Sequence, residues 1–248
     1  GVSSHGDGAD HLLVAAGQQG LCRIDSGGTV SAADDGDGTC LLRSEAQNHS
    51  ADEGKEDAAL SRSAQDIGAD GVLSIAPYYV KPTQEGLFRH FEAVADAIDI
   101  PVIVYNIPGR TGINITSDTL MRIAEVDGIA GVKEASGNMA QIQDILRRRP
   151  EGFEVLSGDD ALTLALVCLG GDGVISVAAN AFPKRFMECV NYAKAGEFDR
   201  AEKAYECLDE AVHALFEEGN PVGVKCALAE MGIIGPTMRL PLVEGSEA

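Results

Sequence analysis

An alternation of strand-like and helix-like segments, which begins at about Asp66, limits how this chain can fold more than any other feature. Short apolar runs rich in β-branched residues are each followed by a turn and an amphipathic stretch. The runs are GVLSIA (71–76), PVIVYN (101–106), GIAGVK (128–133), FEVLSG (153–158) and GVISVA (173–178). Because a parallel neighbour needs a crossover that a helix can supply, this order predicts an α/β fold with a parallel sheet.

The segments between and after these runs have helical periodicity. In GLFRHFEAVADAI (86–98), apolar residues fall at the three-and-four spacing that lines one helix face. After Ala179 the strand pattern stops, and three consecutive helices are predicted. The middle one should carry a continuous apolar seam, formed by Phe198, Ala201, Tyr205, Leu208, Val212 and Leu215.

Residues 1–65 lack this alternation. They are rich in Gly, Ser, Asp and Ala, with turn-like clusters such as DDGDGT (34–39). Only HLLVAAG (11–17) and GTCLL (38–42) have the composition of strands. Much of this segment is therefore predicted to be loop or disordered chain.

Charge and cysteine content exclude several classes of partner. The 39 acidic and 19 basic residues give a net charge of -20, which repels nucleic-acid phosphates and anionic lipids. No run approaches the roughly 18 apolar residues that a membrane span needs, and no signal peptide is evident. The six cysteines form no C-x-x-C pair or metal-ligand spacing. We therefore expect reduced thiols, no metal site and a cytoplasmic location.

Lys133 ends an apolar run that a parallel sheet would bury. Ligand sites in parallel α/β folds lie at the carboxyl ends of the strands. A lysine becomes a nucleophile when apolar surroundings favour its uncharged amine. The alternative is a lysine whose amine reaches solvent past the end of the strand.

The preceding strand-like run ends in a similar way, in VIVYNIPGRTG (102–112). Tyr105 at its end can transfer a proton, and Arg110 in the following turn has the planar guanidinium that suits a carboxylate. Each has an ordinary alternative, which is core packing for the tyrosine and a surface ion pair for the arginine. Together with Lys133, they predict one site at successive strand ends.

Other strand ends carry weaker signals. APYYVKPTQEG (76–86) contains paired tyrosines, which often serve packing alone. In LSGDDAL (156–162), Asp159 and Asp160 are predicted to cap the helix that follows. In GVISVAAN (173–180), small residues leave room for a ligand near Val177.

Five motifs, in this order and spacing, resemble the dihydrodipicolinate synthase family. They are PYYVKPTQEGLFRHF, YNIPGRTG, GVKEASGN, LSGDD and GVISVAAN, and the match runs from about Asp66 to the C-terminus. The resemblance implies a (β/α)8 TIM barrel, with its active-site portion over 66–180, a helical region over 181–248 and an atypical segment (1–65) in place of the first barrel units.

The resemblance also implies a function. It indicates a lyase of lysine and diaminopimelate biosynthesis, in which Lys133 forms a Schiff base with pyruvate that then attacks aspartate semialdehyde. Tyr105 matches the family's proton-relay tyrosine, and Arg110 its substrate-carboxylate arginine. Gly158 and Val177 match its backbone contacts. Tyr79 matches a tyrosine that reaches a neighbouring subunit, so a homodimer or homotetramer is implied, with no metal or organic cofactor.

The chain also departs from the family pattern. The family's Gly-Thr-Thr-Gly-Glu motif is missing, GGTVS at 27–31 being the nearest string, and Val80 replaces an asparagine after the paired tyrosines. One hypothesis for this abrupt change is that residues before Asp66 are read from a shifted frame. The hypothesis fails if no alternative frame of the coding DNA restores the motif. Two other readings stay open, namely a sister pyruvate aldolase for sugar acids or sialic acid, and a catalytically defective relative.

Overall fold

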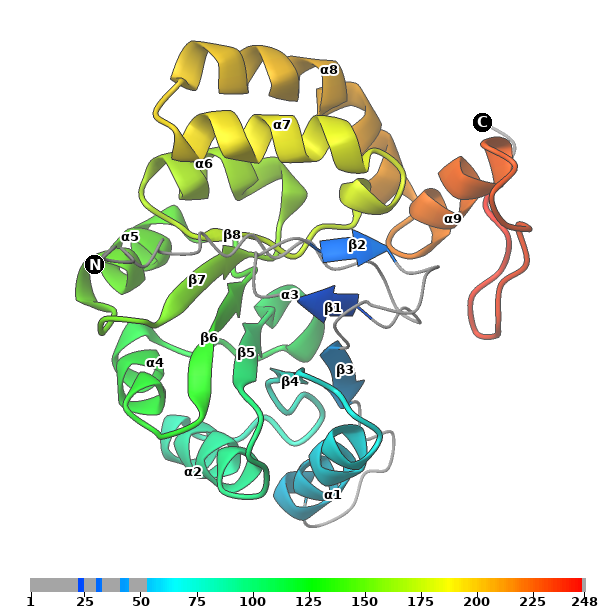
Figure 1. Ribbon diagram of the computed structural model, residues 1–248. Coiled ribbons are helices and arrows are strands. Elements are labelled where there is room, and N and C mark those ends of the chain that lie inside the picture. Colours follow the sequence, from blue (N-terminus) through cyan, green and yellow to red (C-terminus); the bar gives the residue numbers. More distant parts are fainter. Residues whose placement is uncertain (1–21, 25–29, 33–40, 45–52, 247–248) are drawn as a thin grey trace, which may run out of the picture.

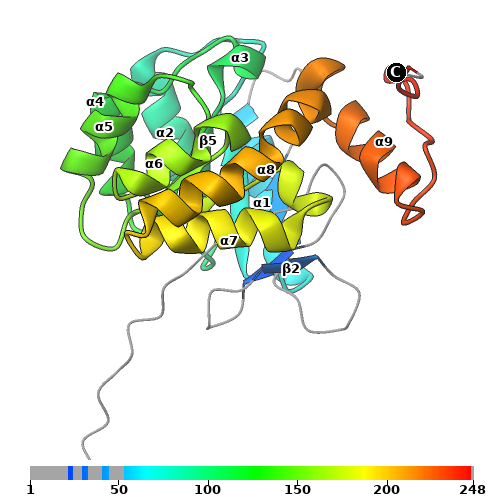
Figure 2. The same ribbon diagram turned by 90° about the horizontal axis from the view of Figure 1, so that it is seen from above.

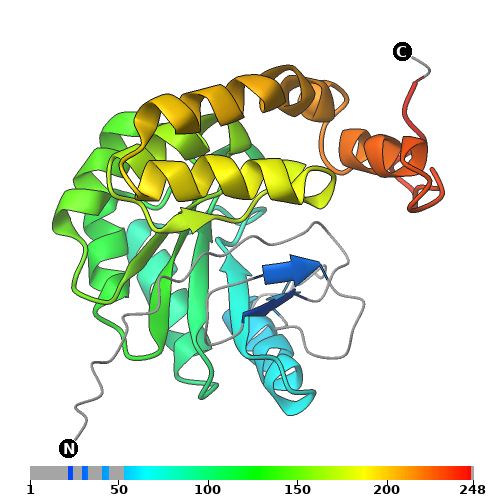
Figure 3. The ribbon, with the colours of Figure 1, turned by 45° about the horizontal axis from the view of Figure 1, so that its top comes forward.

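A computed structural model describes residues 22–24, 30–32, 41–44 and 53–246, with side chains from Gly54 onward. Within these residues, six parallel strands form one sheet, in which each strand pairs with the next along the chain. The strands are β3 (Leu41–Ser44), β4 (Gly71–Ile75), β5 (Val102–Asn106), β6 (Ile129–Glu134), β7 (Glu154–Ser157) and β8 (Gly173–Val174). Two further strands, β1 (Cys22–Ile24) and β2 (Val30–Ala32), form an antiparallel pair, which Figure 3 shows as blue arrows outside the parallel row.

Helices connect the parallel strands and cover the convex side of the curved sheet (Figure 1). They are α1 (Glu53–Asp66), α2 (Gln84–Ala95), α3 (Pro108–Thr111), α4 (Ser117–Ala124), α5 (Met139–Arg148) and α6 (Thr163–Cys168). Two 3-10 turns, η1 (Asp160–Leu162) and η2 (Ala178–Asn180), flank β8. Among the described strands, β3 and β8 are the two edges and do not pair with each other. The sheet thus has the sequential strand order of a (β/α) barrel that is not closed, which confirms the predicted α/β parallel fold.

The three predicted C-terminal helices are confirmed as α7 (Pro183–Lys194), α8 (Phe198–Glu217) and α9 (Val222–Glu230). Figure 2 shows α7 and α8 side by side, and α9 extends away from the body. The predicted seam of α8 needs two corrections. Phe198, in the first turn, is 53% exposed, and Tyr205 is only half-buried. The buried face consists of smaller and later residues, namely Ala201, Ala204, Leu208, Val212 and Leu215.

The loop prediction for residues 1–65 is wrong over α1, which packs against α2. The strand-like character of GTCLL is confirmed in part, since β3 pairs in parallel with β4. The helix was missed because its buried face carries small and polar side chains, with Asp57, Ser61 and Ala64 at helical spacing. The expected strand HLLVAAG lies outside the described residues. Of GTCLL, Leu41 and Leu42 begin β3.

Side-chain alternation along the strands divides the core into two layers. On β5, Val102 and Val104 pack beneath the helices, whereas Ile103 and Tyr105 belong to a separate cluster on the concave side. That cluster consists of Leu73, Ile75, Ile103, Tyr105, Leu156 and Ile175. Successive residues of a strand face opposite sides, so this pattern places Tyr105 inside the barrel.

Two observations on the described residues concern the cysteines and the apolar character of the helices. The cysteines with described side chains, Cys168, Cys189, Cys207 and Cys226, are free thiols. Within residues 53–246, no helix combines the length and apolar character that crossing a bilayer requires.

Gly131 in β6 gives a test of the sheet packing. A Cβ at this position would lie 2.6 Å from the backbone oxygen of Glu154 on β7. We expect Gly131→Ala to lower the free energy of unfolding by about 1–3 kcal/mol, because the paired strand must shift. Urea unfolding measures this, with Gly109→Ala as the matched control, since no heavy atom lies within 4 Å of a Cβ there. Equal unfolding midpoints for the two variants would contradict this packing.

Candidate active site

Tyr105 and Lys133 face each other across two neighbouring strands. They are direct register partners in the β5–β6 ladder, and the Lys133 Nζ lies 4.1 Å from the centroid of the Tyr105 ring. Tyr105 is buried and Lys133 is half-buried. The structure therefore brings together the predicted amine and the predicted phenol on the concave side of the sheet.

Gly158 supplies the space that the Lys133 side chain occupies. It follows β7, and its N–H donates to the Glu134 carbonyl oxygen at 2.8 Å. A Cβ at Gly158 would lie 3.0 Å from both Cγ and Cε of Lys133. A glycine here thus allows the lysine to extend along the strand end. These distances place Gly158 beside Lys133, and its expected backbone contact with substrate stays a prediction.

Asp160 is a site residue that the sequence reasoning missed. Its side chain is buried, and its Oδ2 accepts hydrogen bonds from the N–H groups of Val177 (3.0 Å) and Ala178 (2.8 Å). The capping prediction is thus wrong for Asp160, whereas Asp159 does cap η1 by accepting from the Ala161 N–H at 3.1 Å. The sequence shows only two adjacent carboxylates before an apolar run. It does not indicate which one caps the helix and which one binds backbone N–H groups distant in sequence.

The pKa of Asp160 depends on both its burial and nearby charge. Burial raises the pKa of the Asp160 carboxyl, and hydrogen bonds together with the positive charge of Lys133 partly oppose that rise. Through its two bonds to backbone N–H groups, Asp160 joins the end of β7 to the start of η2.

The backbone and side chain of Val177 are both engaged within the protein. Its N–H is bound by Asp160, its carbonyl accepts from the Asn180 backbone and side chain, and its side chain packs with the outer core beside α7. Ile175 instead shares the inner cluster with Tyr105. The structure thus does not bring the Val177 side chain to Tyr105, and its proposed substrate contact stays a prediction.

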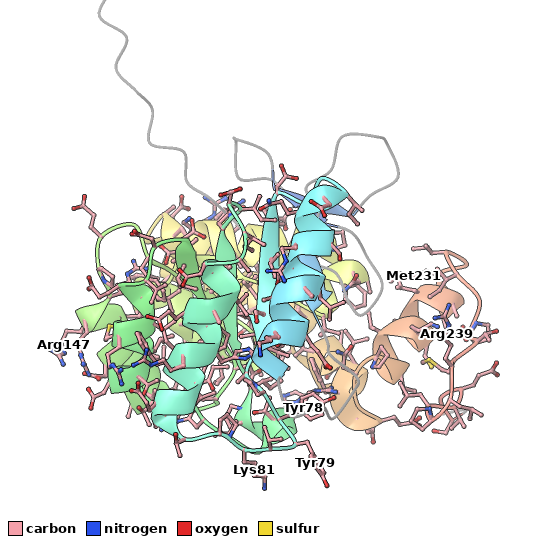
Figure 4. All side chains as sticks on the ribbon, turned by 90° about the horizontal axis from the view of Figure 1, so that it is seen from below. Tyr78, Tyr79, Lys81, Arg147, Met231 and Arg239 are labelled. Atoms are coloured by element: carbon pink, nitrogen blue, oxygen red, sulfur yellow. The ribbon has the colours of Figure 1, made fainter. Side chains whose placement is uncertain are left out.

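Arg110 and Tyr79 lie at the rim. The exposed Arg110 guanidinium donates to the carbonyl of Asn220, which precedes α9, at 3.1 Å. Tyr79, in the loop after β4, is 69% exposed, and Figure 4 shows it pointing away from the body beside Lys81. The substrate role of Arg110 and the subunit role of Tyr79 stay predictions.

Metal ligands were not predicted from the sequence. Over the part of the chain that the structure describes, no three His, Cys, Asp or Glu side chains gather closely enough to hold a metal ion.

The buried Asp160 carboxyl predicts a pH dependence of stability. A raised pKa means that the folded state holds the proton more tightly than the unfolded state, whose carboxyl titrates at about pH 4. The free energy of unfolding should therefore fall as pH rises from this value to the raised pKa. Asp160→Asn removes this effect, so the variant should gain stability relative to wild type between about pH 4 and pH 7. Urea unfolding at both pH values checks this, and an equal difference at both would contradict it.

Comparisons with known proteins agree with this geometry. A model of the dihydrodipicolinate synthetase family matches residues 50–248, so the match begins earlier than the motifs after Asp66 indicate and includes α1. The chain is 51% identical over 179 residues to the 4-hydroxy-tetrahydrodipicolinate synthase of Nitrosomonas europaea, covering 72% of this chain and 61% of that protein. It is 49% identical over 177 residues to the enzyme of that name from Parabacteroides distasonis, covering 71% and 60%.

Solved structures show the same relationship. The dihydrodipicolinate synthase of Aquifex aeolicus superposes with a TM-score of 0.76 at 45% identity, covering 78% of this chain and 66% of that one. The enzyme from Thermotoga maritima gives a TM-score of 0.77 at 40% identity, covering 79% and 68%. The chain spans about three fifths of the length of the curated relatives it matches.

Proposed function

Because the chain belongs to the dihydrodipicolinate synthetase family, we propose that it condenses pyruvate with aspartate semialdehyde through an imine on Lys133. The observation that supports this most is the position of the Lys133 amine 4.1 Å from the centre of the buried Tyr105 ring. A lysine at a strand end beside a phenol can act as a nucleophile once its amine has lost a proton.

The reaction assigns a distinct task to each residue. The uncharged Lys133 amine attacks the ketone carbon of pyruvate, and loss of water from the adduct gives the imine. Removal of a methyl proton from the imine gives an enamine, whose carbon attacks the aldehyde of the second substrate. Tyr105 is proposed to transfer protons in these steps, since strand register holds its ring beside the amine. No cofactor beyond the covalent imine is required in this scheme.

The remaining assignments concern binding and assembly. Arg110 is proposed to bind the carboxylate of the incoming substrate, and Gly158 and Val177 to contact substrate through their backbones. The exposed Tyr79 suits a contact with a second subunit, in a dimer or tetramer. We further propose a cytoplasmic role in lysine and diaminopimelate biosynthesis, and no nucleic-acid or membrane partner.

Product formation with different aldehydes tests this function. The protein is incubated with pyruvate and either aspartate semialdehyde or a sugar-acid aldehyde, and products are measured by mass spectrometry. We expect condensation with aspartate semialdehyde to be faster. Equal or faster turnover of the sugar-acid aldehyde would favour a sister aldolase. A pyruvate adduct on Lys133 without any condensation product would identify a defective relative.

A further inference from the structure

A second pair of residues lies directly behind the reacting pair. Asn106 and Glu134 are the last residues of β5 and β6 and are register partners, one position beyond Tyr105 and Lys133. Because successive strand residues face opposite sides, their side chains point away from the concave side. Asn106 is 0% exposed and Glu134 is 1% exposed. The proposed mechanism uses neither of them.

A hydrogen bond across the two strands joins this pair. The Oδ1 of Asn106 accepts from the Ile115 N–H at 3.0 Å, and this backbone donor sets the orientation of the amide. The Nδ2 then donates to the Glu134 Oε2 at 3.0 Å and to the Asn114 Oδ1 at 2.9 Å. The Glu134 Oε1 accepts from the Ser136 N–H at 2.8 Å. All hydrogen-bonding atoms of the Asn106 amide are therefore engaged.

Amide side chains between the strand ends and the helices form further hydrogen bonds around this pair. The Asn114 Nδ2 donates to the Gln141 Oε1 of α5 at 2.8 Å, and the Gln141 Nε2 donates to the Ile115 carbonyl at 3.2 Å. The Gln84 Nε2 at the start of α2 donates to the Asn114 carbonyl at 2.8 Å. The strand ends are thus anchored to two helices and one loop, in a site where an unpaired polar group would be costly.

We propose that Asn106 and Glu134 are positioning residues, whose bond holds the ends of β5 and β6 in the register that places Lys133 over Tyr105. Past this pair, one backbone bond from the Ala135 N–H to the Asn106 carbonyl (2.8 Å) joins the two strands, and the side-chain bond adds to it against fraying of the strand ends. This inference rests on the proposed function only where it concerns catalysis. The position of Lys133 over the Tyr105 ring, which it explains, exists without substrate.

Isosteric variants break this bond from either side. In Glu134→Gln, one of the two oxygens becomes an NH2 group. If that group faces Asn106, two donors meet; if it faces Ser136 instead, the Ser136 N–H loses its acceptor. In Asn106→Asp, two carboxyl groups meet across the strands while Ile115 keeps its acceptor. The matched control is Asp172→Asn, because Asp172 also accepts from a strand N–H, that of Val155 at 2.7 Å, but does so before β8 begins.

The position of Lys133 over Tyr105 has a spectroscopic signature. Reductive methylation with ¹³C-formaldehyde places methyl groups on each lysine Nζ, and the face of an aromatic ring shifts nearby methyl resonances upfield. The Lys133 methyl signal, identified by its loss in Lys133→Ala, should lie upfield of that of the exposed Lys184. Circular dichroism confirms that each variant is folded, so a loss of overall stability alone does not move this signal.

We expect Glu134→Gln and Asn106→Asp to lose most of the upfield shift, and Asp172→Asn to keep it. If either folded site variant keeps the wild-type shift, or if Asp172→Asn loses it to the same extent, the positioning role is overturned. Should one site variant fail to fold, the other decides. Because this measurement uses no pyruvate, its failure is distinct from failure of the proposed function, which a missing pyruvate adduct on Lys133 would show.

Discussion

Lys133→Ala should lower the rate of condensation by roughly 10³-fold or more, because covalent catalysis has no other amine at this position. The Lys133 Nζ lies 4.1 Å from the centroid of the Tyr105 ring, so its loss removes the amine from the site. The rate is measured as product formed from pyruvate and aspartate semialdehyde.

Lys184→Ala is the matched control for this experiment. Lys184 is exposed in the first turn of α7, so its loss should leave the rate unchanged. Circular dichroism of both variants excludes unfolding as the cause of a lower rate. Retention of more than a small fraction of activity by folded Lys133→Ala would contradict an imine on this residue.

Tyr105→Phe should lower the rate of condensation by about 10²–10⁴-fold, the range typical for loss of a positioned acid or base. Phenylalanine keeps the ring that Lys133 contacts and the packing of the inner cluster, and removes only the hydroxyl. Imine formation with pyruvate, measured by borohydride trapping, should decline less than condensation if proton transfer is the main loss.

The control here is Tyr192→Phe. Tyr192 lies on α7, where its hydroxyl accepts from the Arg200 guanidinium at 2.8 Å, and its change should leave the rate unaltered. An unchanged rate in Tyr105→Phe would remove the proton-transfer role. A loss of the same size in both variants would show that the effect is not specific to the site.

The sequence allowed prediction of those parts of the fold that depend on apolar periodicity. Runs such as PVIVYN have β-branched side chains on both faces, which fits a parallel strand buried between two layers. The same runs end at Tyr105 and Lys133, and parallel pairing brings successive strand ends together. For this reason the central pair of the site could be predicted from the sequence.

Features that depend on contacts distant in sequence were missed. Helix α1 buries Asp57 and Ser61, which a hydrophobic pattern does not identify. Asp160 binds backbone N–H groups 17 and 18 residues further along the chain, and Glu134 is bound by Asn106 from the neighbouring strand. Each of these features depends on a residue that the fold brings close from elsewhere in the chain. A local sequence motif does not indicate which residue that is.

The central claim is that the Lys133 amine captures a ketoacid, and borohydride reduction in the presence of pyruvate tests it most directly. The reduced protein is digested and each lysine-containing peptide is analysed by mass spectrometry. The proposed function predicts a stable pyruvate adduct on the peptide that contains Lys133 and on no other, and its loss when pyruvate is omitted. A protein that carries no adduct, or carries one on another lysine while Lys133 stays unmodified, would contradict it.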